Sequence, residues 1–125
     1  MWNEAAPSVT HSAGVVFIGG KPIRMDYAIR DAFWVDSRVI VLLDPNAILA
    51  DPTYGKDRRR GNDAIRNLRA LSGDGAMLWQ AELPESADYY YRIENRNPLI
   101  VLSFSSYRCE IDQQTGHIIG KQFLK

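Results

Sequence analysis

The sequence predicts an all-β fold, an antiparallel meander that forms a sandwich or an open barrel. About nine short runs show strand patterns, with turn signals between them roughly every 8 to 12 residues. Two of these runs, residues 39–43 and 99–102, are apolar on both faces, as expected of central strands. A third run ends in Gly19-Gly20, which predicts a two-residue hairpin.

Length and composition predict a single domain over residues 1–125. The chain has 125 residues, of which 46% are hydrophobic, enough to bury a core without staples. Its 15 basic residues balance 15 acidic ones, which argues against a general binder of nucleic acid or membrane surfaces. The single cysteine, Cys109, excludes an internal disulfide and a multi-cysteine metal site. Its place in an alternating apolar run predicts a buried thiol.

The N-terminal part predicts a loose arm, a hairpin and one long strand. Residues 1–13 are expected to form the arm, and residues 15–18 a short strand that leads into the glycine turn. Apolar residues then alternate with polar ones over residues 23–35, and Asp31 interrupts the series. This pattern predicts a long strand with a bulge or bend at Asp31.

A turn, a buried strand and a long insertion are expected next. Asp36-Ser37 leads into the strand at 39–43, which ends at Asp44-Pro45 because proline cannot donate to a ladder. Residues 44–66 form the insertion, and a connection of this length in a compact domain is often functional or disordered. A helical turn is allowed near its end, with Asn62 as N-cap.

The C-terminal run, residues 98–125, predicts two or three antiparallel strands around tight turns. Its first strand is expected to place Ile100, Leu102 and Phe104 on one face. Asp112 and Gly116 predict a hairpin loop, since aspartate bonds nearby backbone amides and glycine accepts a positive φ. Ahead of this run, further strand patterns occupy residues 68–71, 77–83 and 89–93.

Part of this pattern recurs. The surroundings of Gly75 match those of Gly116 at an offset of 41 residues, and residues 38–42 match residues 98–102 at an offset of 60. The first copy therefore carries an insertion of about 19 residues between its central strand and its hairpin. Two copies of one unit would each bury a face against a neighbour.

Residues 111–119 and 68–79 carry a resemblance to the strand-turn-strand piece of quinoprotein-type β-propeller blades, which has an aliphatic residue and Asp, then Thr-Gly and an aliphatic pair. Two such units do not close a propeller, which typically has four to eight blades. The resemblance therefore implies neither the quinone cofactor nor its ligands. The chain as a whole is also similar to small bacterial proteins, some of them immunity proteins against toxins, which implies a protein partner.

The sequence predicts no catalytic residue, no metal site and no cofactor. His11 lies in the expected arm and His117 follows a turn, and no residue is spaced from them as in a triad or a metal site. Residues 1–12 lack the pattern of a signal peptide, and the apolar runs are too short to span a bilayer, which favours the cytoplasm. An enzyme that uses His117 or an acidic pair stays open as a third alternative.

Basic and aromatic side chains are the candidate binding residues. Guanidinium and ammonium groups can bind phosphate or carboxylate, and aromatic side chains are common at interface hot spots, although charged loops are usually only solvated. These observations favour a non-catalytic module that binds another protein, with a nucleic-acid or nucleotide binder as the alternative. Edge strands also allow partner addition or self-pairing. The candidates are Trp34, Tyr54, Lys56, Arg58, Arg59, Arg60, Tyr89 and Tyr91.

Overall fold

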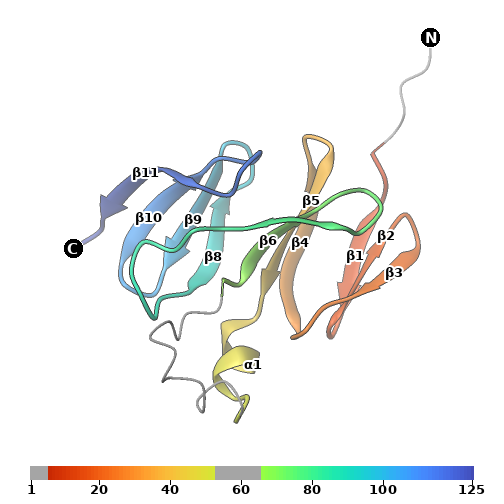
Figure 1. Ribbon diagram of the computed structural model, residues 1–125, viewed down its shortest axis with the longest axis horizontal. Coiled ribbons are helices and arrows are strands. Elements are labelled where there is room, and N and C mark those ends of the chain that lie inside the picture. Colours follow the sequence, from red (N-terminus) through yellow and green to blue (C-terminus); the bar gives the residue numbers. More distant parts are fainter. Residues whose placement is uncertain (1–5, 53–65) are drawn as a thin grey trace.

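The described residues fold into three antiparallel β-sheets, which confirms the predicted all-β class. The computed structural model describes residues 6–52 and 66–125, and within them it contains eleven strands and one short helix. The sheets stand side by side, with the second between the first and the third (Figure 1). The number of strands exceeds the expected nine because the N-terminal part contains two more than its pattern predicted.

The first sheet contains β1 (Val9–Ser12), β2 (Val15–Ile18) and β3 (Lys21–Arg24) in that order. The hairpin at Gly19-Gly20 is confirmed, and both glycines have a positive φ, 56° and 85°. The loose arm predicted for residues 1–13 is wrong over its last part, because β1 pairs with β2 along its whole length. This polar segment has no strand pattern of its own, and it becomes a strand because it pairs with β2.

The second sheet contains β4 (Ile29–Val35), β5 (Arg38–Leu43), β6 (Leu68–Leu71) and β7 (Met77–Gln80) in that order. The predicted long strand over residues 23–35 is wrong, since the chain leaves the first sheet after Arg24 and enters the second at Ile29. A register shift between Ile29 and Asp31 does confirm the irregularity expected at Asp31.

The third sheet contains β8 (Tyr90–Asn95), β9 (Leu99–Ser103), β10 (Tyr107–Ile111) and β11 (Ile118–Phe123). Its strands are neighbours in chain order, as in the second sheet. The loop before β11 forms as predicted: Asp112 Oδ1 accepts from the backbone N–H of Gln114 at 2.8 Å, and Gly116 has φ +79°. Phe104, expected on the strand face, instead lies in the turn after β9.

Strand β5 is buried on both faces, as its sequence predicted. Val39, Val41 and Leu43 belong to the apolar core between the first and second sheets. Ile40 and Leu42 belong to the core between the second and third sheets. All five side chains are at most 1% exposed. The second sheet is therefore the middle layer, and β5 is the strand on which both cores are built.

A short helix begins where β5 ends. Helix α1 (Pro45–Leu49) has Asp44 as its N-cap, whose Oδ1 accepts from the backbone N–H of Asn46 at 2.9 Å. Proline suits the first turn of a helix, because its missing N–H would have no partner there. The insertion at 44–66 thus starts as a helix, and the helical turn expected after Asn62 falls mostly on residues outside the described ranges.

A buried amide connects the second and third sheets. The Nδ2 group of Asn67 donates to the carbonyl oxygens of Leu43, at 3.0 Å, and of Tyr90, at 2.7 Å. Its Oδ1 accepts from the backbone N–H of Tyr90 at 3.1 Å. Asn67 is fully buried. One side chain therefore satisfies backbone groups at the end of β5 and the start of β8 at once.

Replacing this amide should destabilise the fold. We expect Asn67→Ala to lower the free energy of unfolding by about 2–4 kcal/mol, because it leaves several buried backbone groups without partners. The control is Asn95→Ala, which removes a single bond from an exposed side chain to the carbonyl of Pro98. It should cost no more than about 0.5–1 kcal/mol in the same urea titration. Equal losses for the two variants would contradict the role assigned to Asn67.

Two hairpin glycines allow close contact with the preceding sheet. A Cβ atom on Gly75, in the β6–β7 turn, would overlap with Cδ1 of Ile23 in β3. A Cβ atom on Gly116, in the β10–β11 turn, would lie 2.7 Å from Cε3 of Trp79 in β7. These are the two glycines that match at an offset of 41 residues. Each packs its hairpin against the last strand of the sheet before it.

The effect of the close contact between Gly116 and Trp79 on stability can be measured separately from the effect of the positive φ of Gly116. We expect Gly116→Ala to destabilise the protein by about 2–4 kcal/mol, since the methyl group adds overlap with Trp79 to the cost of the left-handed backbone. Gly20→Ala is the matched control, because Gly20 has φ +85° with nothing within 4 Å of its Cβ position. It should lose only about 1 kcal/mol by thermal or urea unfolding. Similar losses would show that the approach to Trp79 is not tight.

Candidate functional site

Most of the predicted basic site falls outside the described residues. Tyr54, Lys56, Arg58, Arg59 and Arg60 all lie between residues 53 and 65, which the structure does not describe. Their role in binding stays a prediction. The described ends of the insertion, α1 on one side and Arg66 on the other, show where it joins the fold (Figure 1).

Trp34 lies apart from the two predicted tyrosines. It pairs with Val39 next to the turn at Asp36-Ser37, and its ring packs on the core between the first and second sheets. Tyr89 and Tyr91 flank the start of β8, at the opposite end of the second sheet, where β5 leads into α1. The structure therefore brings two of the three described aromatic candidates together, and Trp34 covers the sheet.

Tyr89 is half-buried and Tyr91 is exposed, and both lie near further apolar side chains at this end of the molecule. We name this group the aromatic end and define it as Leu49, Tyr89, Tyr91 and Phe104. The rings of Tyr89 and Phe104 stack with their centroids 5.0 Å apart and an interplanar angle of 22°. Phe104 is 65% exposed, Leu49 53% and Tyr91 39%. Large apolar side chains exposed together on a small domain are typical of an interaction surface.

An arginine holds the start of β8 against the start of the insertion. The guanidinium of Arg30 donates to the carbonyl of Tyr91 at 2.9 Å and forms an ion pair with Asp44 at 3.2 Å. Asp44 is also the N-cap of α1. This bridge fixes β8 and the helix relative to each other, so that the aromatic side chains and Leu49 lie at one end of the molecule.

Sequence reasoning missed Phe104 as a surface residue. The alternation of residues 99–104 placed it on the strand, whereas β9 ends at Ser103 and the turn follows immediately. The available signal was the pair Ser105-Ser106 directly after it, since a large aromatic at the start of a turn has no sheet face to cover.

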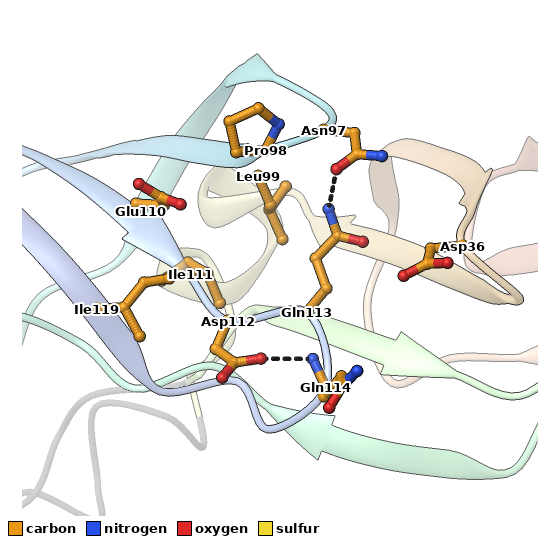
Figure 2. A pocket seen from close by; sticks show the side chains of 10 residues that line it. All are labelled: Asp36, Asn97, Pro98, Leu99, Glu110, Ile111, Asp112, Gln113, Gln114 and Ile119. Carbon is orange, nitrogen blue, oxygen red and sulfur yellow. Dashed lines mark hydrogen bonds between the residues drawn. The ribbon is translucent and has the colours of Figure 1, made fainter.

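A concave site lies at the other end of the third sheet, among hairpin turns. This hairpin pocket has a volume of about 410 Å³ (Figure 2). It is formed by the β4–β5 turn, the β8–β9 turn and the β10–β11 loop with the ends of their strands. It is lined by Asp36, Asn97, Pro98, Leu99, Glu110, Ile111, Asp112, Gln113, Gln114 and Ile119.

The lining of the hairpin pocket includes several hydrogen-bond acceptor groups. Gln113 donates through Nε2 to Oδ1 of Asn97 at 3.3 Å, as Figure 2 shows, while its own Oε1 is buried and has no partner among the described residues. The carboxylates of Asp36, Glu110 and Asp112 complete the lining. Such a surface suits ligands that carry hydrogen-bond donors.

A neighbouring pocket of about 560 Å³ shares Asn97 with the hairpin pocket. It lies along the end of β8 and includes Asp31 and Arg96. The Arg96 guanidinium carbon lies 4.5 Å from the centroid of the Phe33 ring, a cation–π contact. This arginine is therefore engaged in covering the core at the β8–β9 turn.

His117 and the acidic side chains are the residues that the sequence left open for catalysis. No group of three or more His, Cys, Asp or Glu side chains among the described residues is placed to hold a metal ion. His117 is largely exposed, and its Nδ1 lies 3.9 Å from a carboxylate oxygen of Glu82. That pair faces solvent and lines neither of the two pockets described above. The described part of the chain also contains no helix that is long and apolar enough to cross a membrane.

Cys109 is fully buried, as the sequence predicted, and burial raises the pKa of its thiol. At pH 8 the native thiol should therefore stay protonated and inaccessible. We expect Ellman's reagent to react with the native protein at least about 100-fold more slowly than with the protein unfolded in guanidinium. Equally fast reaction in both states would contradict the burial of β10 against the second sheet.

With the fold and both surfaces established, the chain can be compared with known families. The family model described as "Domain of unknown function (DUF7957)" matches residues 7–123. The chain belongs to the DUF7957 family. The match runs from just before β1 to the last residue of β11, so all three sheets are part of the domain. Neither the curated proteins nor the solved structures contain a significant match to it.

Proposed function

We propose that the protein is a non-catalytic module that binds another protein through its aromatic end. The observation that carries this proposal is the stack of the half-buried Tyr89 ring on the exposed ring of Phe104. Phe104 is the most exposed of the large apolar side chains described, at 65%. A stacked pair held in one conformation loses little entropy when a partner covers it, as is common at protein–protein hot spots.

The surface is held in place by the fold. Asp88 is 1% exposed, and its Oδ1 accepts from the backbone N–H groups of Tyr89, at 2.8 Å, and Ser105, at 3.1 Å. The N–H of Phe104 in turn donates to the carbonyl of Tyr89 at 2.9 Å. These bonds fix the backbone on both sides of the stack, so the rings are positioned before any partner binds.

An immunity-type inhibitor of a bacterial toxin is the most concrete form of this function, and it rests on the resemblance to small bacterial proteins. Such inhibitors need a preformed surface and no catalytic group, which agrees with the aromatic end. The basic run at Lys56, Arg58, Arg59 and Arg60 would add charged contacts from the same insertion that begins with α1.

The proposal predicts that one exposed ring contributes much of the binding energy. Immobilised wild-type protein should retain a specific protein from an extract of its source, and Phe104→Ser should weaken that complex by about 30-fold, as measured with the purified partner. Met77→Ser is the control, because Met77 is 48% exposed on β7, away from the aromatic end. It should change the affinity by less than about 2-fold.

The alternative, binding to nucleic acid, predicts a different result. Counterion release would make affinity fall by several orders of magnitude between low and physiological salt, whereas an aromatic protein contact should fall much less. Retained nucleic acid with steep salt dependence would contradict the proposal. So would a captured protein whose affinity is unchanged in a folded Phe104→Ser variant.

A further inference from the structure

Strand β11 has one edge that no other strand covers. It is the outermost strand of the third sheet and pairs on one side with β10. The N–H of Leu124 donates to the carbonyl of Ser106 at 2.8 Å, so the backbone groups of Leu124 point toward β10. Because these groups alternate along a strand, those of Gln122 and Gly120 also face β10. The backbone groups of Lys121 and Phe123 therefore point outward, to the open edge.

The first part of this edge is already occupied. The N–H of Ile118 donates to the side-chain carboxylate of Glu82 at 2.9 Å, and the N–H of Glu82 donates to the carbonyl of Gly116 at the same distance. The segment after β7 therefore blocks the start of β11. The open edge of β11, which we define as Lys121, Gln122 and Phe123, has no such cover among the described residues.

The side chains beside the open edge are apolar and cationic. The rings of Phe123 and Tyr107 lie with their centroids 5.2 Å apart, and Nζ of Lys121 lies 5.1 Å from the centroid of the Tyr107 ring. Phe123 is 53% exposed. An exposed edge with an unpaired backbone and an aromatic flank is suited to the addition of another strand.

We propose that the open edge pairs antiparallel with the same edge of a second copy of the chain. Only outward-facing backbone groups can bond across such an interface, and Lys121 and Phe123 allow three symmetric registers between them. Pairing Lys121 with Lys121 places like charges opposite each other, and pairing Phe123 with Phe123 places Lys121 opposite Lys125. Both are destabilising. The third register sets Lys121 opposite Phe123 and Gln122 opposite Gln122, and has no such repulsion.

This register extends a contact that one copy already makes. Within one chain, Lys121 lies over the ring of Tyr107. In this register the same face of the sheet brings Lys121 close to Phe123 of the other chain, so each ammonium group contacts two aromatic rings. The two-fold axis passes between the Gln122 residues, and the paired sheets become one sheet of eight strands. About four backbone hydrogen bonds and two phenylalanine side chains make a small interface, so the dimer is weak and depends on concentration.

Sedimentation equilibrium tests the dimer. Wild type should pass from monomer to dimer between about 5 μM and about 500 μM, as mass action requires. Lys121→Pro should weaken dimerisation at least 10-fold while leaving the fold intact, because the N–H it removes points away from β10. Lys121→Ala keeps that N–H and is the matched control, which should dimerise at least 5-fold more tightly than the proline variant.

Cross-linking tests the register. In the proposed register, the two Gln122 residues form a pair without hydrogen bonds to each other. The Cα atoms of such a pair lie about 4.5 Å apart, within reach of a disulfide between cysteines. Gln122→Cys should therefore form a covalent dimer under mild oxidation at least 10-fold faster than Lys121→Cys, and the buried Cys109 should not compete. Wild type that stays monomeric throughout, a Lys121→Pro variant that dimerises like wild type, or faster cross-linking of Lys121→Cys would each overturn the proposal.

Discussion

The structure depends on the burial of β5 from both sides. A sheet that covers one core needs one apolar face, but the middle layer of three must be apolar on both. Residues 39–43 meet this requirement with five consecutive aliphatic side chains, none more than 1% exposed. The first sheet packs against one face of this strand and the third sheet against the other. Neither outer sheet would have a core of its own without it.

Where the sheets meet, polar contacts set their relative position. Apolar packing alone is non-directional, whereas the amide of Asn67 bonds backbone groups of β8 and of the end of β5 at defined distances. The indole Nε1 of Trp79 similarly donates to the carbonyl of Gln113 at 2.8 Å, so β7 is tied to the β10–β11 loop. The third sheet is thus bonded to the second at both of its ends. The same bonds fix the aromatic end and the hairpin pocket, which lie at those two ends.

The sequence was informative where structure is decided locally. The turns at Gly19-Gly20, Asp36-Ser37 and Asp112 to Gly116, and the buried strand at 39–43, follow from residue types within a few positions of each other. The break after Arg24 could not be predicted in this way. The alternation of apolar and polar residues continues through the break. Met25 and Tyr27 pack against the core between the first and second sheets, although they belong to neither sheet. The two strands β3 and β4 are separate because one sheet packs on the other, and the sequence of residues 23–35 alone does not show this.

The candidate site was predictable in part for the same reason. Tyr89 and Tyr91 were identified by residue type, and the structure adds Phe104 and Leu49, which come from distant segments and share only a position at one end of the fold. No local pattern brings residues 49, 91 and 104 together. Two sets of contacts do so. Arg30 bonds both Asp44, the N-cap of α1, and the carbonyl of Tyr91 in β8. The N–H of Phe104 bonds the carbonyl of Tyr89, just before β8.

The matching glycines suggest why association would use ends and edges of this domain rather than its faces. Gly75 and Gly116 each press a hairpin onto the sheet before it, so every sheet covers its predecessor and the last sheet keeps one uncovered face. Arg108 and Glu94 alternate with Cys109 and Ile93, which face the core, so they lie on the uncovered face, where they form an ion pair at 2.8 Å. Exposed apolar side chains are found at the aromatic end, beside β11 and on β7, where Met77 and Leu78 are exposed. Charged side chains on this outer face disfavour packing against a further sheet. At the aromatic end and at the open edge of β11, by contrast, a partner would bury apolar side chains or pair with free backbone groups.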